Sequence, residues 1–264
     1  MRTEFRVRRT PNLESDLKIK TILVSQPEPK TDASPYHELA RKQKVKVDFR
    51  PFIHVEAVGA ADVRQQKVTI ADHTAVILTS RNAVDHYFRV CEEMRFTVPA
   101  TMKYFCMSEA IAFYLQKYTT YRKRKIYYGK QLFADLMDVI KKHKGEKYLL
   151  PSSDLLKPVI PQLLEENKID YTRAVLYNTV CSDLSDLEDV FYDVLVFFSP
   201  SGIKSLFQNF PDFQQKDTRI AVFGQTTVKA AQEAGLKVNI EAPSVKAPSM
   251  TMALEQYIKE ENKK

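Results

Sequence analysis

The sequence predicts an α/β protein made of two doubly wound parallel-sheet lobes, and three observations carry this prediction. Apolar runs rich in β-branched residues alternate with helix-period patterns almost throughout, which is typical of parallel strands joined by helical crossovers. A chain of 264 residues is long enough for two domains of about 100–150 residues each. The expected strands are also too many for one small sheet, so two lobes are the natural division.

The expected elements follow in order along the chain. Short apolar runs bounded by polar or turn residues predict strands at 20–25, 45–49, 75–79, 103–107, 125–128, 147–150, 194–198, 219–223 and 237–241. Apolar residues at helical spacing predict helices at 35–44, 82–94, 109–117, 130–143, 155–167, 201–209, 226–234 and 249–261.

Two extended stretches, 49–58 and 173–181, interrupt the alternation because no helix directly adjoins them. If both are linkers, residues 59–172 form an inserted lobe, and residues 18–48 join residues 182–264 in a discontinuous one. The strand–helix–strand pattern at the start would then complete the sheet of the C-terminal half. The residue pattern alone leaves this division open.

The composition fits a soluble globular protein, since apolar residues make up 44% of the chain and charged residues 28%. The longest apolar runs, such as 75–78 and 193–198, are far too short to cross a bilayer, so we expect no membrane partner. Residues 1–17 are largely charged and polar and lack the apolar core of a signal peptide. They predict a mobile tail on a cytoplasmic protein.

No metal site is predicted. The three cysteines, Cys91, Cys106 and Cys181, form no CxxC pattern and are expected to be small apolar residues rather than ligands. The five histidines show no paired spacing of the kind that binds metal ions.

The net charge of +7 is compatible with nucleic-acid binding or with a small polyanionic substrate. The basic run at 122–125 is short and fits a solvated strand edge, and no zinc-finger, RNP-like or GXXG signature accompanies it. The six glycines form neither GxGxxG nor the Walker A pattern, which excludes the usual dinucleotide and P-loop chemistry.

Hydroxyl-bearing residues stand where expected strands end and helices begin. At 199–202, Ser199 is a good N-cap and Pro200 occupies the preferred first helical position. Similar junctions occur at 79–82, 152–154 and 225–227. Capping alone would explain one such junction. Several of them at the carboxyl ends of strands, where helix N-termini attract anions, favour an anion-binding edge.

The segments 194–202, 222–236, 79–84 and 175–180 resemble those of the uroporphyrinogen III synthase family, and residues 149–169 look like the stretch before that family's central tyrosine strand. The ordered set spans about residues 20–260. No single motif is specific; their order carries the resemblance.

The resemblance implies two lobes, 18–48 plus 182–264 and 59–172, joined by a two-stranded linker at 49–58 and 173–181 with a cleft between them. It implies a lyase without a cofactor that closes the linear polycarboxylate hydroxymethylbilane, loses water and inverts the last pyrrole. The expected partner is this small molecule rather than nucleic acid, and we expect a monomer.

Tyr177 matches the tyrosine usually assigned the catalytic part in that family. A phenol with an ordinary pKa of about 10 is protonated at neutral pH and can donate to a departing hydroxyl; packing on a buried strand is the alternative explanation. The residues expected to bind substrate are Ser80, Ser108, Ser152, Ser153, Ser199, Ser201, Gly202, Gln225, Thr226 and Thr227. Thr227 matches a family threonine, and helix capping is its alternative role.

The chain departs from the family pattern in the first-half counterpart of its Gly-Gln-Thr-Thr junction, which reads Met107-Ser108-Glu109-Ala110. Glu109 would repel a carboxylate unless it points away or pairs with a base, so the inserted lobe's share in binding stays open. Two other functions remain as alternatives: a non-catalytic, two-lobed anion-binding or regulatory protein, and a basic nucleic-acid binder.

Overall fold

The structure, a computed structural model, describes residues 18–130 and 132–262. The mobile tail expected at 1–17 lies outside the described residues. The chain forms two compact units: unit 1 comprises the residues up to His54 and those from Val180 onward, and unit 2 comprises Val55–Thr179.

The described residues of unit 1 form a five-stranded sheet in the order β11-β10-β9-β1-β2, in which all neighbouring strands are parallel. The strands are β1 (Thr21–Val24), β2 (Lys46–Phe49), β9 (Val194–Phe197), β10 (Arg219–Phe223) and β11 (Val238–Ala242). β9 is fully buried because helices cover both faces of the sheet, which is why its sequence is a continuous apolar run.

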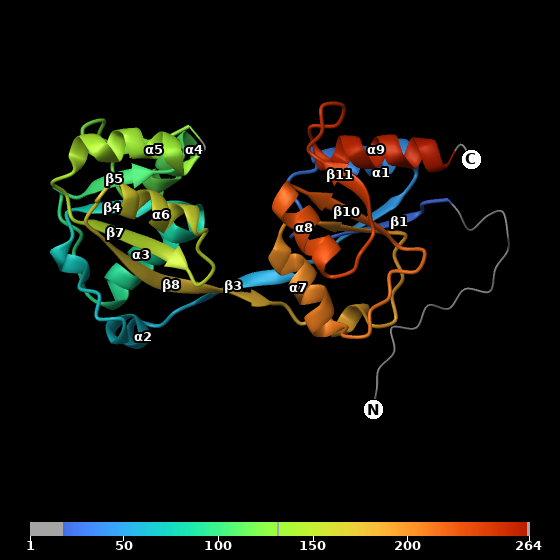
Figure 1. Cartoon of the computed structure of the whole chain (residues 1–264), viewed down its shortest axis with the longest axis horizontal. Helices are drawn as coiled ribbons and strands as arrows, with labels where there is room; N and C mark the ends of the chain where they lie inside the picture. The colour runs from blue at the N-terminus through green and yellow to red at the C-terminus, as the bar shows by residue number, and fades with distance from the viewer. Residues whose placement is uncertain (1–17, 131, 263–264) are drawn as a thin grey trace. The chain divides into compact units, whose positions relative to one another are not determined.

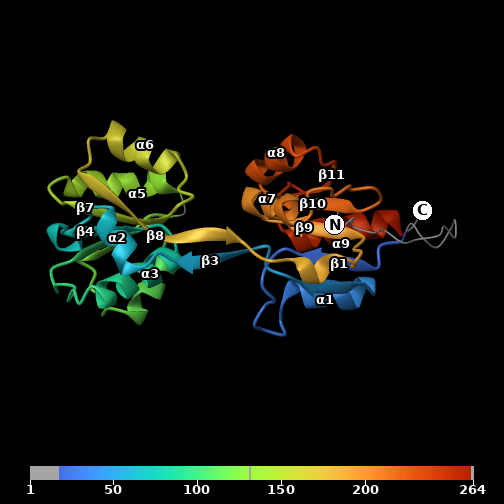
Figure 2. The same ribbon diagram turned by 90° about the horizontal axis from the view of Figure 1, so that it is seen from below.

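Helices cover both faces of the unit 1 sheet (Figures 1 and 2). On one face, α1 (Pro35–Gln43) and α9 (Met250–Glu261) pack through residues such as Leu39 and Leu254. On the other face, α7 (Pro200–Asn209) and α8 (Gln225–Glu233) pack through residues such as Ile203 and Val228. The 3-10 helix η4 (Ser185–Leu187) adds Leu187 to the second of these cores.

The described part of unit 2 contains a six-stranded sheet in the order β3-β8-β7-β4-β5-β6, and its strands from β8 to β6 are parallel. The strands are β3 (Ile53–Ala57), β4 (Ala75–Leu78), β5 (Lys103–Cys106), β6 (Ile126–Tyr128), β7 (Tyr148–Ser153) and β8 (Tyr171–Cys181). Alternate side chains of β4 enter two different cores: Val76 and Leu78 pack on one face, and Ala75 and Ile77 on the other.

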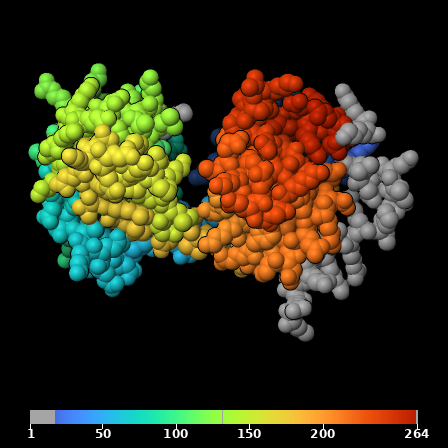
Figure 3. Space-filling view, in the orientation of Figure 1, coloured from blue at the N-terminus to red at the C-terminus, as the bar shows by residue number. Residues whose placement is uncertain are grey.

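One face of this sheet carries α2 (Ala60–Gln65), α3 (Arg81–Glu93) and α4 (Glu109–Tyr114), and the other carries α5 (Phe133–Ile140) and α6 (Val159–Glu166). Figure 3 shows α6, in yellow, at the surface of the unit. The short 3-10 helices of unit 2 are η1 (Ile70–Asp72), η2 (Leu115–Lys117) and η3 (Lys141–His143). The architecture of each unit confirms the predicted doubly wound α/β fold.

The strand orders create one topological switch point in each described sheet. In unit 1 the chain runs from β1 to β2 on one side and from β9 to β11 on the other, so the switch lies between β1 and β9. In unit 2 the switch lies between β4 and β7. Doubly wound folds bind ligands outside the carboxyl ends of the strands at such points.

The chain passes between the two units within β3 and β8. These strands are antiparallel, because Val58 N donates to Leu176 O at 3.0 Å while Ser182 N donates to Phe52 O at 2.9 Å. The sequence predicted extended chain at both places. It did not predict α2, a helix of six residues in which only Val63 is buried.

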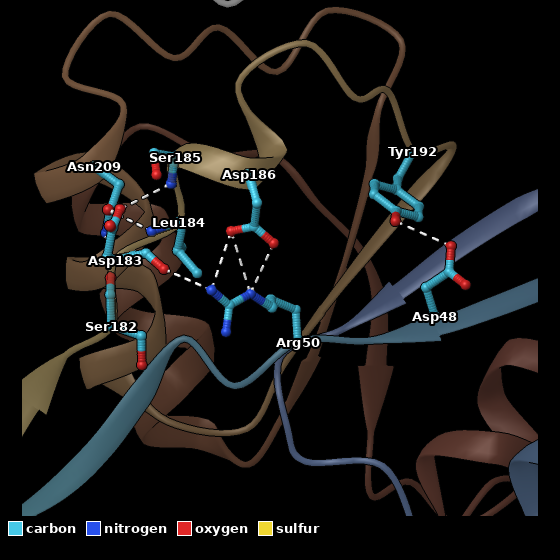
Figure 4. A network of polar contacts seen from close by, with 9 residues as sticks. All are labelled: Asp48, Arg50, Ser182, Asp183, Leu184, Ser185, Asp186, Tyr192 and Asn209. Atoms are coloured by element: carbon cyan, nitrogen blue, oxygen red, sulfur yellow. Dashed lines mark hydrogen bonds and ion pairs between the residues drawn. The ribbon is translucent and has the colours of Figure 1, made fainter.

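A polar network fixes the chain where it re-enters unit 1 after β8 (Figure 4). Arg50, which follows β2, donates to both carboxylate oxygens of Asp186 and to Asp183 O at 2.8 Å. Asn209 of α7 accepts from Leu184 N at 2.9 Å and donates to Ser182 O at 2.9 Å. These bonds satisfy backbone groups that a turn would otherwise leave unpaired.

Candidate active site

Ser80 stands at the switch point of unit 2, directly after β4. It is the N-cap of α3, and its Oγ accepts a hydrogen bond from Ala83 N at 3.0 Å. The same Oγ lies 3.1 Å from the Tyr177 hydroxyl, where either oxygen can be the donor. The serine therefore does more than cap the helix, since it also joins α3 to β8.

Tyr177 lies in β8, where it pairs with Ser153 of β7, and its side chain is 6% exposed. Burial raises the pKa of its phenol above the ordinary value, whereas the hydrogen bond with Ser80 acts in the opposite direction. The phenol is consequently protonated at neutral pH. It is held with its hydroxyl at the carboxyl edge of the sheet.

His86 and Arg89 of α3 complete the surroundings of Tyr177. The His86 imidazole stacks on the Tyr177 ring with centroids 4.8 Å apart and planes 19° apart. Arg89 Nε donates to His86 Nδ1 at 3.1 Å. Burial and the Arg89 charge lower the pKa of His86. Neither residue was predicted from the sequence, because His86 lacks metal-binding spacing and Arg89 belongs to no recognised motif; their helical i, i+3 spacing was the available signal.

Arg81, the first residue of α3, is a further residue that the sequence analysis missed. Its guanidinium carbon lies 5.3 Å from the centre of the Tyr114 ring. The Tyr114 hydroxyl donates to both oxygens of Asp85, at 2.9 and 2.8 Å, which fixes the ring. Arg81 thus gives the unit 2 edge an exposed positive charge next to Ser80.

Ser108 is the N-cap of α4, but its side chain makes no capping hydrogen bond. Glu109, the next residue, accepts a hydrogen bond from the Tyr128 hydroxyl at 3.2 Å. Among the described residues, the hydrogen-bond partner of the Glu109 carboxylate is thus a phenol, and no ion pair with a Lys or Arg side chain is seen there. The edge of β5 is less suited to an anion than the edge of β4.

Ser152 and Ser153 do not start a helix, contrary to the expected junction at 152–154. β7 continues through Ser153, and α6 begins only at Val159. The reason is Arg173 of β8, whose Nε donates to Ser152 Oγ at 2.9 Å and whose Nη2 donates to Ser153 O at 2.8 Å. Ser152 is 1% exposed, so its hydroxyl serves the β7–β8 pair.

In unit 1, Ser199 stands directly after β9 at the switch point and caps α7, accepting from Gly202 N at 3.2 Å. A Cβ on Gly202 would lie 3.3 Å from Phe197 Cδ1 and 3.8 Å from the hydroxyls of Ser199 and Ser25. The contact with Phe197 would be tight, whereas those with the two hydroxyls are ordinary van der Waals contacts, so Gly202 mainly leaves room for the Phe197 ring. Ser201 is half-buried in the first turn.

Ser25 was not singled out from the sequence, although it follows an apolar strand as the other serines do. Its backbone N donates to Val196 O at 3.0 Å, which places it across the switch point from Ser199. Ser25 shows the same pattern of a strand followed by a serine, but the expected strand at 20–25 included Ser25 as its last residue.

The junction after β10 depends on Gly224, whose φ of 87° lies in the left-handed region that favours glycine. Gly224 N donates to Ala242 O at 2.7 Å, and Thr227 N donates to Gly224 O at 3.0 Å. Gln225 and Thr226 are exposed in the first turn of α8, whereas Thr227 is 1% exposed. Of the two threonines, only Thr226 presents its side chain to solvent.

The family model described as uroporphyrinogen-III synthase HemD matches residues 34–252, which is most of the chain. The chain belongs to this family. The resemblance predicted from the sequence is confirmed.

Individual relatives agree with the family assignment. A uroporphyrinogen-III synthase of Chlorobaculum parvum is 24% identical over 257 residues, which cover 91% of this chain and 100% of that protein. The crystal structure of the uroporphyrinogen-III synthetase of Helicobacter pylori covers 91% of this chain and 99% of its own, with a TM-score of 0.60 and 18% identity. A mutant uroporphyrinogen III synthase of Thermus thermophilus covers 93% and 100%, with a TM-score of 0.55 and 13% identity. The two structures share the fold of this chain.

The described residues contain no group of three or more His, Cys, Asp or Glu side chains arranged to hold a metal ion. Burial raises the pKa of the Cys91 thiol to about 11 and that of Cys106 to about 12, so neither is a ready nucleophile or ligand. No helix in the described part of the chain is both long and apolar enough to span a membrane. The polar chemistry of the described edges lies in hydroxyls, backbone amides and Arg81.

Proposed function

We propose that this chain is a uroporphyrinogen III synthase that closes linear hydroxymethylbilane into uroporphyrinogen III, inverting the last pyrrole and losing water without a cofactor. The observation that carries the proposal is the Tyr177–Ser80 pair, with its oxygens 3.1 Å apart at the switch point of unit 2, in a chain that belongs to this family.

Tyr177 acts as the general acid in this proposal. Electron density from the pyrrole nitrogen expels the hydroxyl of the hydroxymethyl group, which takes the phenolic proton and leaves as water. Ser80 Oγ already accepts from Ala83 N, and its own proton is free to point at the Tyr177 oxygen. That arrangement leaves the phenolic proton for the leaving group and stabilises the negative charge that develops on Tyr177.

The last pyrrole then attacks the electrophilic methylene carbon, with a spiro intermediate on the way to the inverted ring. The proton released when the macrocycle regains its pyrroles returns to Tyr177, so no proton, electron or group is left unbalanced. Much of the rate enhancement would come from holding the two reacting ends of the flexible linear substrate close together.

The polar edge of each unit, taken by itself, offers groups suited to the acetate and propionate carboxylates of the substrate. In unit 1, Ser199 and Thr226 offer hydroxyls at the N-termini of α7 and α8, which favour negative charge, and Ser25 is buried beside α7. In unit 2, Arg81 adds a positive charge next to Ser80. The net charge of +7 supports a polycarboxylate substrate.

A coupled assay tests the proposal. Hydroxymethylbilane is generated in situ, purified chain is added, and the type I and type III uroporphyrinogens are separated after oxidation. We expect type III to predominate in proportion to the amount of chain. If only the symmetric type I ring forms, at the rate seen without the chain, the enzyme proposal is wrong and a non-catalytic anion binder becomes the better explanation.

The alternatives have distinct signatures. An anion-binding or regulatory protein would be stabilised thermally by uroporphyrin but would make no type III ring. A nucleic-acid binder would show DNA or RNA affinity that falls steeply with salt. We expect neither nucleic-acid binding nor self-association, so the chain should elute as a monomer in size-exclusion chromatography.

A further inference from the structure

Three side chains of α3 contact β8 at or beside Tyr177, and we call this set the Tyr177 clamp: Ser80, His86 and Arg89. Ser80 meets the hydroxyl of Tyr177 and His86 covers one face of its ring. Arg89 Nη2 donates to Leu176 O at 3.0 Å, the carbonyl immediately before Tyr177. The phenol is therefore held at its tip, its face and its backbone by one helix.

The hydrogen bond from Arg89 determines which nitrogen of His86 carries the proton. A guanidinium has only donors, so Nδ1 of His86, 3.1 Å from Arg89 Nε, must be the acceptor. The neutral imidazole consequently carries its proton on Nε2. Burial and the Arg89 charge oppose protonation of the ring, while Asp85 and Glu93 on the same helix act in the other direction.

Arg89 is itself fixed, which makes it an anchor rather than a mobile surface side chain. Nη2 also donates to Val58 O at 2.9 Å, and Nη1 pairs with Glu93 Oε1 at 2.6 Å. The arginine thus spans α3, the chain following β3 and strand β8. Because Arg89 is fixed, the His86 imidazole that it binds has a fixed orientation relative to the Tyr177 ring.

We propose that His86 is a positioning residue for Tyr177, with Arg89 holding the imidazole so that its plane backs the phenol and directs the Tyr177 hydroxyl towards Ser80 and the substrate. This inference rests on the proposed function, because it concerns the same phenol. Without the stacked ring, the phenol gains freedom to turn about its side-chain bonds. The proton would then be delivered less often in the productive geometry, with little change in substrate binding.

Variants of the clamp separate this role from a merely structural one. His86→Leu removes the ring, and His86→Phe restores a flat ring without an acceptor for Arg89. Arg89→Met removes the hydrogen bond that holds the His86 imidazole but keeps the His86 side chain itself. His143→Leu is the matched control: His143 also packs on aromatic rings, 5.4 Å from Phe105 and 4.6 Å from Tyr127, but it lies away from Tyr177 on η3.

The first readout is the steady-state rate of type III formation by the full chain. We expect His86→Leu and Arg89→Met to lower kcat about 10-fold with KM changed less than about 2-fold, because positioning acts on the proton transfer. His86→Phe should recover part of kcat, and His143→Leu should match the wild type. Equal kcat in His86→Leu and wild type would overturn the inference while leaving the proposed function intact.

The second readout does not need activity. In chain labelled with ¹³C-tyrosine, the Tyr177 ring signals are assigned by their loss in Tyr177→Phe. We expect His86→Leu and Arg89→Met to shift these signals, because the stacked ring is lost or turned, and His143→Leu to leave them unchanged. Unchanged Tyr177 signals in His86→Leu and Arg89→Met would also overturn the inference. A wild type that makes no type III ring would refute the proposed function alone, since these spectra still report the contact.

Thermal unfolding of each variant shows whether it is folded. If His86→Leu is unfolded, His86→Phe and Arg89→Met carry the test. Arg89→Met should still shift the Tyr177 signals and lower kcat, and wild-type values for both in Arg89→Met would contradict the inference.

Discussion

The carboxyl edges of the two sheets use similar local junctions for different purposes. In unit 1, Ser199 caps α7 and has Ser25 and Gly202 as close neighbours, so the edge is made of hydroxyls and backbone amides. In unit 2, Ser80 caps α3 in the same way but also contacts Tyr177, which His86 covers. The two capping serines therefore differ in their further contacts, because only Ser80 lies beside a strand, β8, that brings a tyrosine hydroxyl to it.

The largest expected effect concerns Tyr177, which lies at the carboxyl edge of the unit 2 sheet. Tyr177→Phe should lower kcat for type III formation about 100-fold or more, because it removes the proton donor while keeping the ring. Steady-state assays of the purified variant measure this. Tyr171→Phe in the same strand is the control, since the Tyr171 hydroxyl donates to Glu165 at 2.9 Å and serves α6. Wild-type kcat in Tyr177→Phe would make Tyr177 a packing residue.

The next effect tests whether unit 1 binds a carboxylate of the substrate. Thr226 is exposed in the first turn of α8 and Thr227 is buried. Thr226→Val should raise KM about 10-fold with little change in kcat, because a hydrogen bond to a charged carboxylate is lost. Thr227→Val should change the midpoint of thermal unfolding instead. The reverse pattern would mean that α8 moves when substrate binds.

A matched pair of cap variants compares the two edges directly. Ser80→Ala and Ser199→Ala should each lower the free energy of unfolding by about 1 kcal/mol, since each removes an N-cap. Only Ser80→Ala should also lower kcat, by about 10-fold, because of the two capping serines it is Ser80 whose hydroxyl lies within hydrogen-bond distance of Tyr177. Denaturant unfolding and kinetics on the same preparations check both parts. Equal kcat in the two variants would remove the distinction drawn between the edges.

The smallest effect is a pH dependence of stability that arises in unit 2. The pKa of His86 is lowered from 6.5 by burial and by Arg89, so below pH 6.5 the unfolded chain takes up a proton that the folded chain refuses. Stability should fall as the pH drops from 6.5 towards the folded pKa of His86, and this contribution should stop changing below that value. His143, whose pKa is also lowered by burial, adds a similar slope.

Thermal unfolding between pH 7.5 and pH 5 measures this slope. His86→Phe should be less sensitive to acid than the wild type, and a variant that also carries His143→Phe should be less sensitive still. If the slope is the same in the wild type and both variants, neither histidine contributes to the loss of stability in acid.

The sequence by itself determined the local elements and the fold class. Parallel strands that are buried on both faces favour continuous apolar runs, and Ser is among the preferred N-cap residues, so β4, β9 and the caps Ser80 and Ser199 could be predicted from neighbouring residues. Tyr177 was marked only through the family resemblance, because nothing local separates it from the other tyrosines.

Strand order and side-chain packing decided the rest. Tyr177 meets Ser80 across 97 positions of the sequence only because β7 and β8 add to the sheet beside β4. The same packing brings Arg173 to Ser152, which extends β7 where a helix start was expected. Local preference sets where an element begins, but the contacts around the Tyr177 phenol join distant segments, and only the folded sheet brings those segments together.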